Sequence, residues 1–211
     1  MKANYDFSKG KKNPYVALAL VKENLGDCKR CGLCKTRKNI VFGAGSRQSD
    51  VMFIGEAPGE DEDLAGVPFV GKAGELLDKM ITAMGYAREY VYIANVLKCR
   101  PPGNRVPEPK EIAKCLPFLK AQISALAPKV IITMGNVATR SLFDIEDGIM
   151  SIRGKWRDYG GIPTMPTFHP SFLLRQASAK KYVRDDLRAV LKRLAELGVT
   201  PPFEVKLKPT K

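Results

Sequence analysis

The sequence predicts an α/β fold: a three-layer sandwich with a small, mainly parallel central sheet flanked by helices. Three short apolar runs, at residues 50–55, 91–96 and 129–134, have the length and composition of buried strands. Helical periodicity lies between them, as in residues 73–84, where apolar residues recur at steps of three and four. Strands that alternate with helices predict a parallel sheet covered on both faces.

The remaining elements are predicted from periodicity and turn residues. We expect helices at 15–25, from near Pro109 (with a kink or a break at Pro117), at 135–143 and around Val183–Leu194, and a hairpin of 151–159 and 162–168 around Gly160-Gly161. Residues 1–14 are expected to form a basic, flexible arm. Residues 15–197 are expected to form one domain, and residues 198–211 a loose tail.

Composition restricts the possible functions. The chain has 211 residues, 45% of them hydrophobic, which suits a single domain with a real core. Its formal net charge of +13, from 35 basic and 22 acidic residues, favours a polyanionic partner such as nucleic acid. No apolar run is long enough to span a membrane, and the first residues lack an apolar signal core, so we expect a cytoplasmic protein without a membrane partner.

Five cysteines suggest a metal or cluster site. They are Cys28, Cys31, Cys34, Cys99 and Cys115. An odd number without a secretory signal argues against a disulfide framework. Cys28 and Cys31 have C-x2-C spacing, as do Cys31 and Cys34, whereas the other two are far apart. This loose second pair favours an iron–sulfur cluster over structural zinc, although spacing alone leaves open which cysteine is spare and whether all are free thiols.

Two candidate catalytic residues follow strands of the predicted sheet. Ligands of parallel sheets bind beyond the carboxyl ends of the strands. Glu56 comes directly after the first strand, where a carboxylate can contact a ligand or orient a water. His169, the only histidine, follows the last strand and is suited to stabilise a departing anion, although a lone histidine is more often structural. The nearby Phe172, Leu173 and Leu174 are core residues by default, although such a turn beside a basic surface can also act as an apolar wedge between DNA bases.

Four motifs together carry a resemblance to a known family. They are GEAPG at 55–59, GVPFVGKAGELLD at 66–78, VYIANVLKCRPPGNR at 91–105 and FHPSFLLR at 168–175. Their order and spacing, with the cysteine pairs, resemble the family 4 uracil-DNA glycosylases, the iron–sulfur type of bacteria and archaea. The resemblance covers about residues 25–197. The family fold, a small parallel sheet between helices, agrees with the fold predicted above.

The resemblance implies a DNA repair glycosylase that flips uracil out of DNA and hydrolyses its N-glycosidic bond, leaving an abasic site. The implied partner is uracil-containing single- or double-stranded DNA, and the implied cofactor is a 4Fe–4S cluster. The implied setting is a monomer in the prokaryotic cytoplasm, associated with the nucleoid. The implied positions are Cys28, Cys31, Cys99 and Cys115 for the cluster; Gly55, Ala57, Phe69 and Asn95 for substrate binding; Glu56 and His169 for catalysis; and Leu173 for the DNA wedge.

The resemblance also implies individual roles. Asn95 would recognise the uracil edge, because a carboxamide both donates and accepts hydrogen bonds. Phe69 would stack on the flipped base, and His169 would face the carbonyl that gathers negative charge. Other members of the wider superfamily carry a water-activating aspartate where this chain has Ala57. Whether Glu56 activates water or only positions the base therefore stays open.

A second departure concerns selectivity. A tyrosine that excludes thymine in the wider superfamily is replaced by Gly59, and Glu62 is a candidate for that task.

Two other function classes remain open. One is a non-catalytic iron–sulfur protein that binds DNA or senses redox state; the other is a zinc-stabilised nucleic-acid-binding module.

Overall fold

A six-stranded sheet lies at the centre of the computed structural model, which describes residues 13–207. The strands are β1 (Ala44–Gly45), β2 (Val51–Gly55), β3 (Tyr92–Asn95), β4 (Val130–Met134), β5 (Arg157–Tyr159) and β6 (Ile162–Thr167), in the order β1-β3-β2-β4-β6-β5. The four inner strands run parallel, and the short strand at each edge is antiparallel to its neighbour. The predicted mainly parallel sheet is confirmed.

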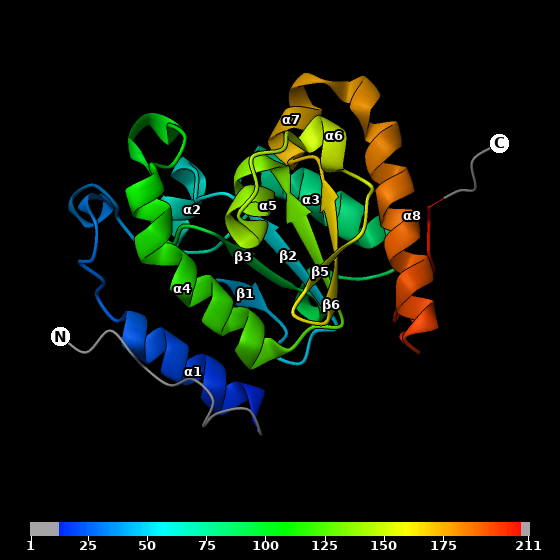
Figure 1. Ribbon diagram of the computed structural model, residues 1–211, viewed down its shortest axis with the longest axis horizontal. Coiled ribbons are helices and arrows are strands. Elements are labelled where there is room, and N and C mark those ends of the chain that lie inside the picture. The colour runs from blue at the N-terminus through cyan, green and yellow to red at the C-terminus, as the bar shows by residue number, and fades with distance from the viewer. Residues whose placement is uncertain (1–12, 208–211) are drawn as a thin grey trace.

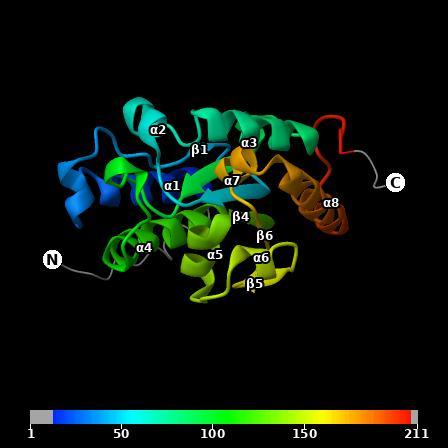
Figure 2. The ribbon, with the colours of Figure 1, turned by 90° about the horizontal axis from the view of Figure 1, so that it is seen from above.

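Helices cover both faces of this sheet. They are α1 (Pro14–Leu25), α2 (Glu60–Ala65), α3 (Lys72–Ala83), α4 (Pro109–Leu126), α5 (Gly135–Phe143), α6 (Ile149–Ile152), α7 (Pro170–Arg175) and α8 (Lys180–Glu196). In Figure 1, α1 and α4 lie side by side at one flank and α8 lies at the other. Figure 2 shows α3 on one side of the sheet and α4 and α5 on the other, which gives the three predicted layers.

Alternation along the strands produces two cores. Val51 and Phe53 of β2 pack with α3 and α8, whereas Met52 and Ile54 pack with α1, α4 and α5. All four side chains are fully buried. Successive residues of a strand point to opposite faces, so an uninterrupted apolar run is what a sheet covered on both sides requires.

The predicted elements are present near their expected bounds, but the short helices α2, α6 and α7 were not predicted. Pro117 neither splits nor ends α4, which continues over 18 residues with the proline on its exposed side. The predicted hairpin is present, and its turn residues Gly160 and Gly161 both have positive φ, as a tight two-residue turn requires. Its first strand is shorter than expected, because residues 149–152 form the helix α6.

The structure describes most of the predicted C-terminal tail but little of the predicted N-terminal arm. The predicted basic arm lies outside the described residues, except that Pro14 already belongs to α1 and Asn13 caps it. The sequence predicts a loose tail after residue 197, yet Phe203 N donates to Gly85 O and Lys206 N to Ala83 O, both at 3.0 Å. No helix among the described residues is long and apolar enough to cross a membrane.

Candidate active site

A cleft of about 750 Å³ opens at the carboxyl edge of the parallel strands, a size usual for small-molecule sites. Register places the ends of β2 and β3 side by side, since Gly55 pairs with Asn95. The ends of β4 and β6 meet in the same way, where Met134 pairs with Thr167. Five predicted site residues line the cleft: Glu56, Ala57, Phe69, Asn95 and His169.

Gly55 forms the floor between two of these side chains. A Cβ atom at this position would lie 2.4 Å from Asn95 Oδ1 and 2.6 Å from Phe69 Cζ. Only glycine therefore lets the amide and the aromatic ring approach the end of β2. The pairing of the two chains continues beyond the strands, because Val96 N donates to Gly55 O and Leu97 N to Glu56 O, both at 3.0 Å.

Asn95 presents an unused hydrogen-bond acceptor to the cleft. Its side chain is 1% exposed. Among residues 13–207, no group donates a hydrogen bond to its Oδ1 atom. An unpaired buried acceptor costs about 1–3 kcal/mol, so such an atom in a cleft indicates a ligand that supplies the missing donor.

His169 is held as a neutral imidazole. It lies at the N-terminus of α7, where its Nδ1 accepts hydrogen bonds from Ser171 N at 3.2 Å and from Ser171 Oγ at 2.8 Å. Burial, and then the positive charge of Arg175, lowers the pKa of His169 to about 4. With Nδ1 accepting, the proton of the neutral ring is on Nε2. The ring centroid lies 5.5 Å from that of Phe69.

Glu56 is a partly buried carboxylate directly after β2. Burial raises the pKa of this carboxyl above its ordinary value. Within the described part of the chain its carboxylate makes no hydrogen bond or ion pair, so both oxygens are available to a ligand or a water. The adjacent Ala57 offers no polar side chain to the cleft.

Glu62 holds two loops of the cleft together. Its Oε2 accepts from Gly59 N at 3.0 Å, and its Oε1 accepts from Val70 N at 2.9 Å and Gly71 N at 3.0 Å. The loop of the first motif is thereby joined to the loop that carries Phe69. Glu62, which the sequence offers as a candidate for excluding thymine, therefore uses its carboxylate to hold these two loops together.

The prediction of Leu173 as a wedge requires a correction. Leu173 is 1% exposed and belongs to the core beside α3 and α8. A buried side chain is not available to enter a duplex. The next residue, Leu174, is 50% exposed. Leu174 does not itself line the cleft, but it is the exposed leucine of this pair and precedes Arg175, which does.

The sequence did not single out several other cleft residues. They include Gly135 and Asn136 after β4, Met150 on α6 and Arg175 at the end of α7. The first two carried a signal, since they directly follow the third predicted strand. Asn136 Oδ1 accepts from Ile149 N at 2.7 Å and so fixes the start of α6. Nothing in the sequence relates Met150 to the cleft, because α6 itself was not predicted.

The predicted cluster ligands gather around a second, smaller cavity. It is lined by Cys28, Cys31, Cys99 and Cys115, whereas Cys34 does not line it. Burial raises the pKa of the Cys99 thiol to about 12 and raises the pKa values of Cys31 and Cys115 as well. Among residues 13–207, no group of three or more His, Cys, Asp or Glu side chains is arranged to hold a metal ion.

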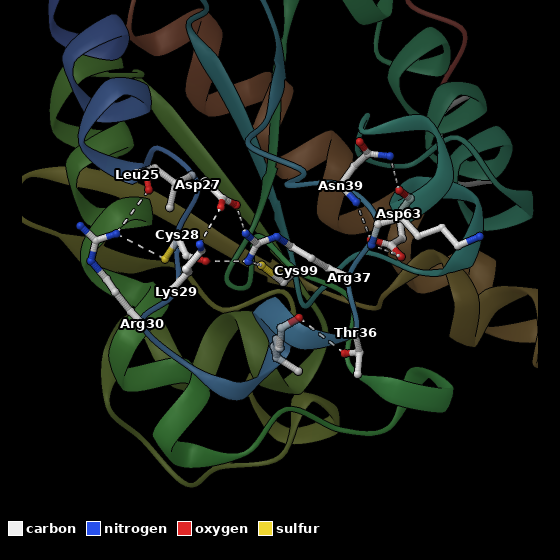
Figure 3. Close-up of polar contacts among 12 residues, drawn as sticks. Leu25, Asp27, Cys28, Lys29, Arg30, Thr36, Arg37, Asn39, Asp63 and Cys99 are labelled. Carbon is white, nitrogen blue, oxygen red and sulfur yellow. Dashed lines mark hydrogen bonds and ion pairs between the residues drawn. The ribbon is translucent and has the colours of Figure 1, made fainter.

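Nitrogen donors point at the sulfur atoms. Arg30 Nη1 lies 3.3 Å from Cys28 Sγ and Arg37 Nη1 lies 3.5 Å from Cys99 Sγ (Figure 3). The backbone N–H of Lys98 donates to Cys115 Sγ at 3.2 Å. Four thiols around one cavity, with N–H donors to the sulfurs, suit the ligation of an iron–sulfur cluster.

Lys98 also joins this cavity to the cleft. It is fully buried, and its Nζ donates to Asn95 O at 2.7 Å and to Gln122 Oε1 at 2.6 Å. The segment between Asn95 and Cys99 is therefore fixed by both its backbone and its lysine side chain. The loop after Cys99 contributes Arg105 to the wall of the cleft.

Comparison with known proteins agrees with this arrangement. The family model described as the uracil DNA glycosylase superfamily matches residues 42–194. The chain therefore belongs to the uracil DNA glycosylase superfamily, as its motifs predict.

Similar proteins narrow the likeness further. Over 192 residues the chain is 43% identical to a type-4 uracil-DNA glycosylase of Saccharolobus solfataricus, covering 87% of this chain and 89% of the relative. Over 174 residues it is 44% identical to a type-4 uracil-DNA glycosylase of Thermotoga maritima, covering 81% of this chain and 91% of the relative. A type-5 uracil-DNA glycosylase of Pyrobaculum aerophilum is 26% identical over 168 residues, covering 72% of this chain and 73% of the relative.

Proposed function

We propose that this protein is a DNA repair glycosylase that flips uracil out of DNA and hydrolyses its N-glycosidic bond, leaving an abasic site. The observation that carries the proposal is the unpaired Asn95 Oδ1, buried in a cleft beside the ring of Phe69 and the neutral imidazole of His169. The names of the type-4 relatives support the choice of uracil as the base.

Asn95 selects uracil by its hydrogen-bonding pattern. Its Oδ1 accepts the ring N–H of uracil, while its amide nitrogen donates to the neighbouring carbonyl. Cytosine has the opposite pattern, an amino group beside an unprotonated ring nitrogen, so it leaves buried polar groups unpaired. Extruding the base costs a few kcal/mol, which stacking on Phe69 offsets in part.

His169 stabilises the leaving group. The bond between the sugar carbon and the uracil nitrogen breaks with its electron pair staying on the base, which leaves an oxocarbenium-like sugar. Negative charge on uracil spreads to a carbonyl oxygen, to which His169 Nε2–H donates. Because the pKa of His169 is about 4, the ring donates this hydrogen bond as a neutral group across the neutral pH range.

Glu56 orients the water that completes the reaction. Water attacks the sugar carbon, forms the new C–O bond and loses a proton to solvent or to a carboxylate. Glu56 lies in the cleft without a partner among the described residues, and its raised pKa favours proton acceptance.

Cys28, Cys31, Cys99 and Cys115 would hold a 4Fe–4S cluster, which suits their shared cavity and their N–H donors. When bound, the cluster supplies a covalent link among segments far apart in sequence. With Cys99 held in this way, the loop from Cys99 to Arg105 is fixed at its first residue, and this loop forms one wall of the cleft.

DNA contact is supported by charge and shape. The net charge of +13 favours phosphate binding. We infer that the half-exposed Leu174, next to the cleft residue Arg175, enters the gap left by the base. We further propose that the protein acts as a monomer on single- and double-stranded DNA. Its relatives come from prokaryotes, whose DNA lies in the cytoplasm, so we place its work at the nucleoid.

The test uses oligonucleotide duplexes that differ in one base. Duplexes with a single uracil, thymine or cytosine are incubated with the purified protein, treated with alkali and analysed for strand breakage and free base. We expect free uracil and breakage only at uracil. Binding of the uracil duplex without release of the base would instead identify a non-catalytic DNA-binding protein and overturn the proposal.

A further inference from the structure

Phe69 adopts a backbone conformation that aromatic residues rarely occupy. Its φ is 54°, in the left-handed region, where a residue with a Cβ is strained by about 1 kcal/mol or more. The ring is 5% exposed and lies against the end of β2, in the cleft. The strained backbone is therefore what directs this ring into the cleft.

Arg88 clamps the backbone on one side of the strained residue. It lies in the short 3-10 helix Arg88–Tyr90, between α3 and β3. Its Nη1 donates to Phe69 O at 2.9 Å and its Nη2 donates to Pro68 O. The same Nη1 contacts Asp78 Oδ1 at 2.8 Å, which anchors the guanidinium to α3.

The other side of the strained residue is held by an anion. Glu62 accepts from the N–H groups of Val70 and Gly71, at 2.9 and 3.0 Å. Arg88, a cation, thus binds the two carbonyls up to Phe69. Glu62, an anion, binds the two N–H groups that follow it. Charge-assisted hydrogen bonds of this kind are about twice as strong as neutral ones, enough to offset the strain.

The geometry points to Arg88 as a positioning residue for excision: by holding the carbonyls of Pro68 and Phe69, it keeps the Phe69 ring where the flipped base stacks. This inference rests on the proposed function. Without the guanidinium, two carbonyls lose their donors and Phe69 can relax to negative φ, which turns the ring away from the cleft. Arg88 acts through Phe69 and does not touch the base.

The experiment measures how tightly free uracil inhibits excision. Arg88→Met keeps the length of the side chain and removes its donors. We expect its inhibition constant for uracil to rise at least about fivefold, the lower end of what stacking on an aromatic ring contributes. Arg193→Met is the matched control: it removes the same charge from an exposed pair on α8 and should leave the constant unchanged.

A double-mutant cycle separates positioning from a general structural role. Phe69→Gly removes the ring and tolerates the left-handed backbone. If Arg88 acts through Phe69, then adding Arg88→Met to Phe69→Gly leaves the inhibition constant unchanged. A parental constant in folded Arg88→Met, or an equal loss in both backgrounds, would overturn the inference.

Failure to fold and failure of the proposed function are distinguished from failure of the role of Arg88. If Arg88→Met does not fold, Arg88→Lys is measured by the same criteria, because one ammonium group cannot span both carbonyls in the guanidinium's geometry. If the parental protein releases no uracil, the proposed function fails. If the parental protein is active and the inhibition constant of the Arg88 variant is parental, only the role of Arg88 fails.

Discussion

The two adjacent leucines of α7 make opposite predictions. Leu173 is 1% exposed in the core, so Leu173→Ala leaves a cavity and should lower the free energy of unfolding by about 2–5 kcal/mol. In a domain of this size, each kcal/mol moves the melting temperature by about 2–4 °C. Leu174 is 50% exposed, and Leu174→Ala should change stability by less than about 0.5 kcal/mol.

The effects on DNA should be reversed. Burying the exposed half of Leu174 in a duplex contributes on the order of 1 kcal/mol, which is about fivefold in rate. Leu174→Ala should therefore slow the single-turnover excision of paired uracil about fivefold and leave uracil in single strands unaffected. Each variant is measured by a thermal melt and by single-turnover excision on both substrates. A Leu173→Ala variant that melts like the parent and loses only duplex excision would refute this assignment and restore Leu173 as the wedge.

Three further predictions follow from the site. Burial raises the pKa of Glu56, so the parental excision rate should fall with acidification through that raised value; Glu56→Gln should lower the rate and abolish this acid limb, and an unchanged pH profile would exclude the carboxylate. His169, with its pKa of about 4, should not contribute to this limb. Cys99→Ser should lose iron and visible absorbance while Cys34→Ser keeps both, and the reverse would refute the ligand set. The dissociation constant for DNA should rise steeply with salt; a flat titration would contradict phosphate binding.

The fold was largely predictable because its signals are local. Buried strands require apolar runs, and the parallel arrangement follows from the alternation with helices. The helix α6 was missed because its four residues, Ile149–Ile152, are mostly apolar and resemble the start of a strand. Pro117 was expected to disrupt α4. It lies on the exposed side of a helix whose other residues, such as Phe118 and Ile123, hold it in the core.

The site was predictable where it obeys a rule of topology. Glu56 and His169 follow parallel strands, and the carboxyl ends of such strands share one edge. The choice between Leu173 and Leu174 depends on which side of one helical turn faces α3, and adjacent leucines carry no sign of it. The role of Arg88 could not be predicted from the sequence, for another reason. It contacts backbone carbonyls 19 and 20 residues away, and a carbonyl is the same in every residue.

His169 allows the most direct test of the account. Its neutral imidazole is proposed to stabilise the departing uracil anion, so it should act on the transition state far more than on DNA binding. The measurement is the single-turnover rate of uracil excision by His169→Ala at neutral pH, with a thermal melt and a DNA dissociation constant beside it. We predict a loss of about a hundredfold or more in rate, with little change in the other two. A folded His169→Ala variant that excises uracil at the parental rate would contradict the mechanism.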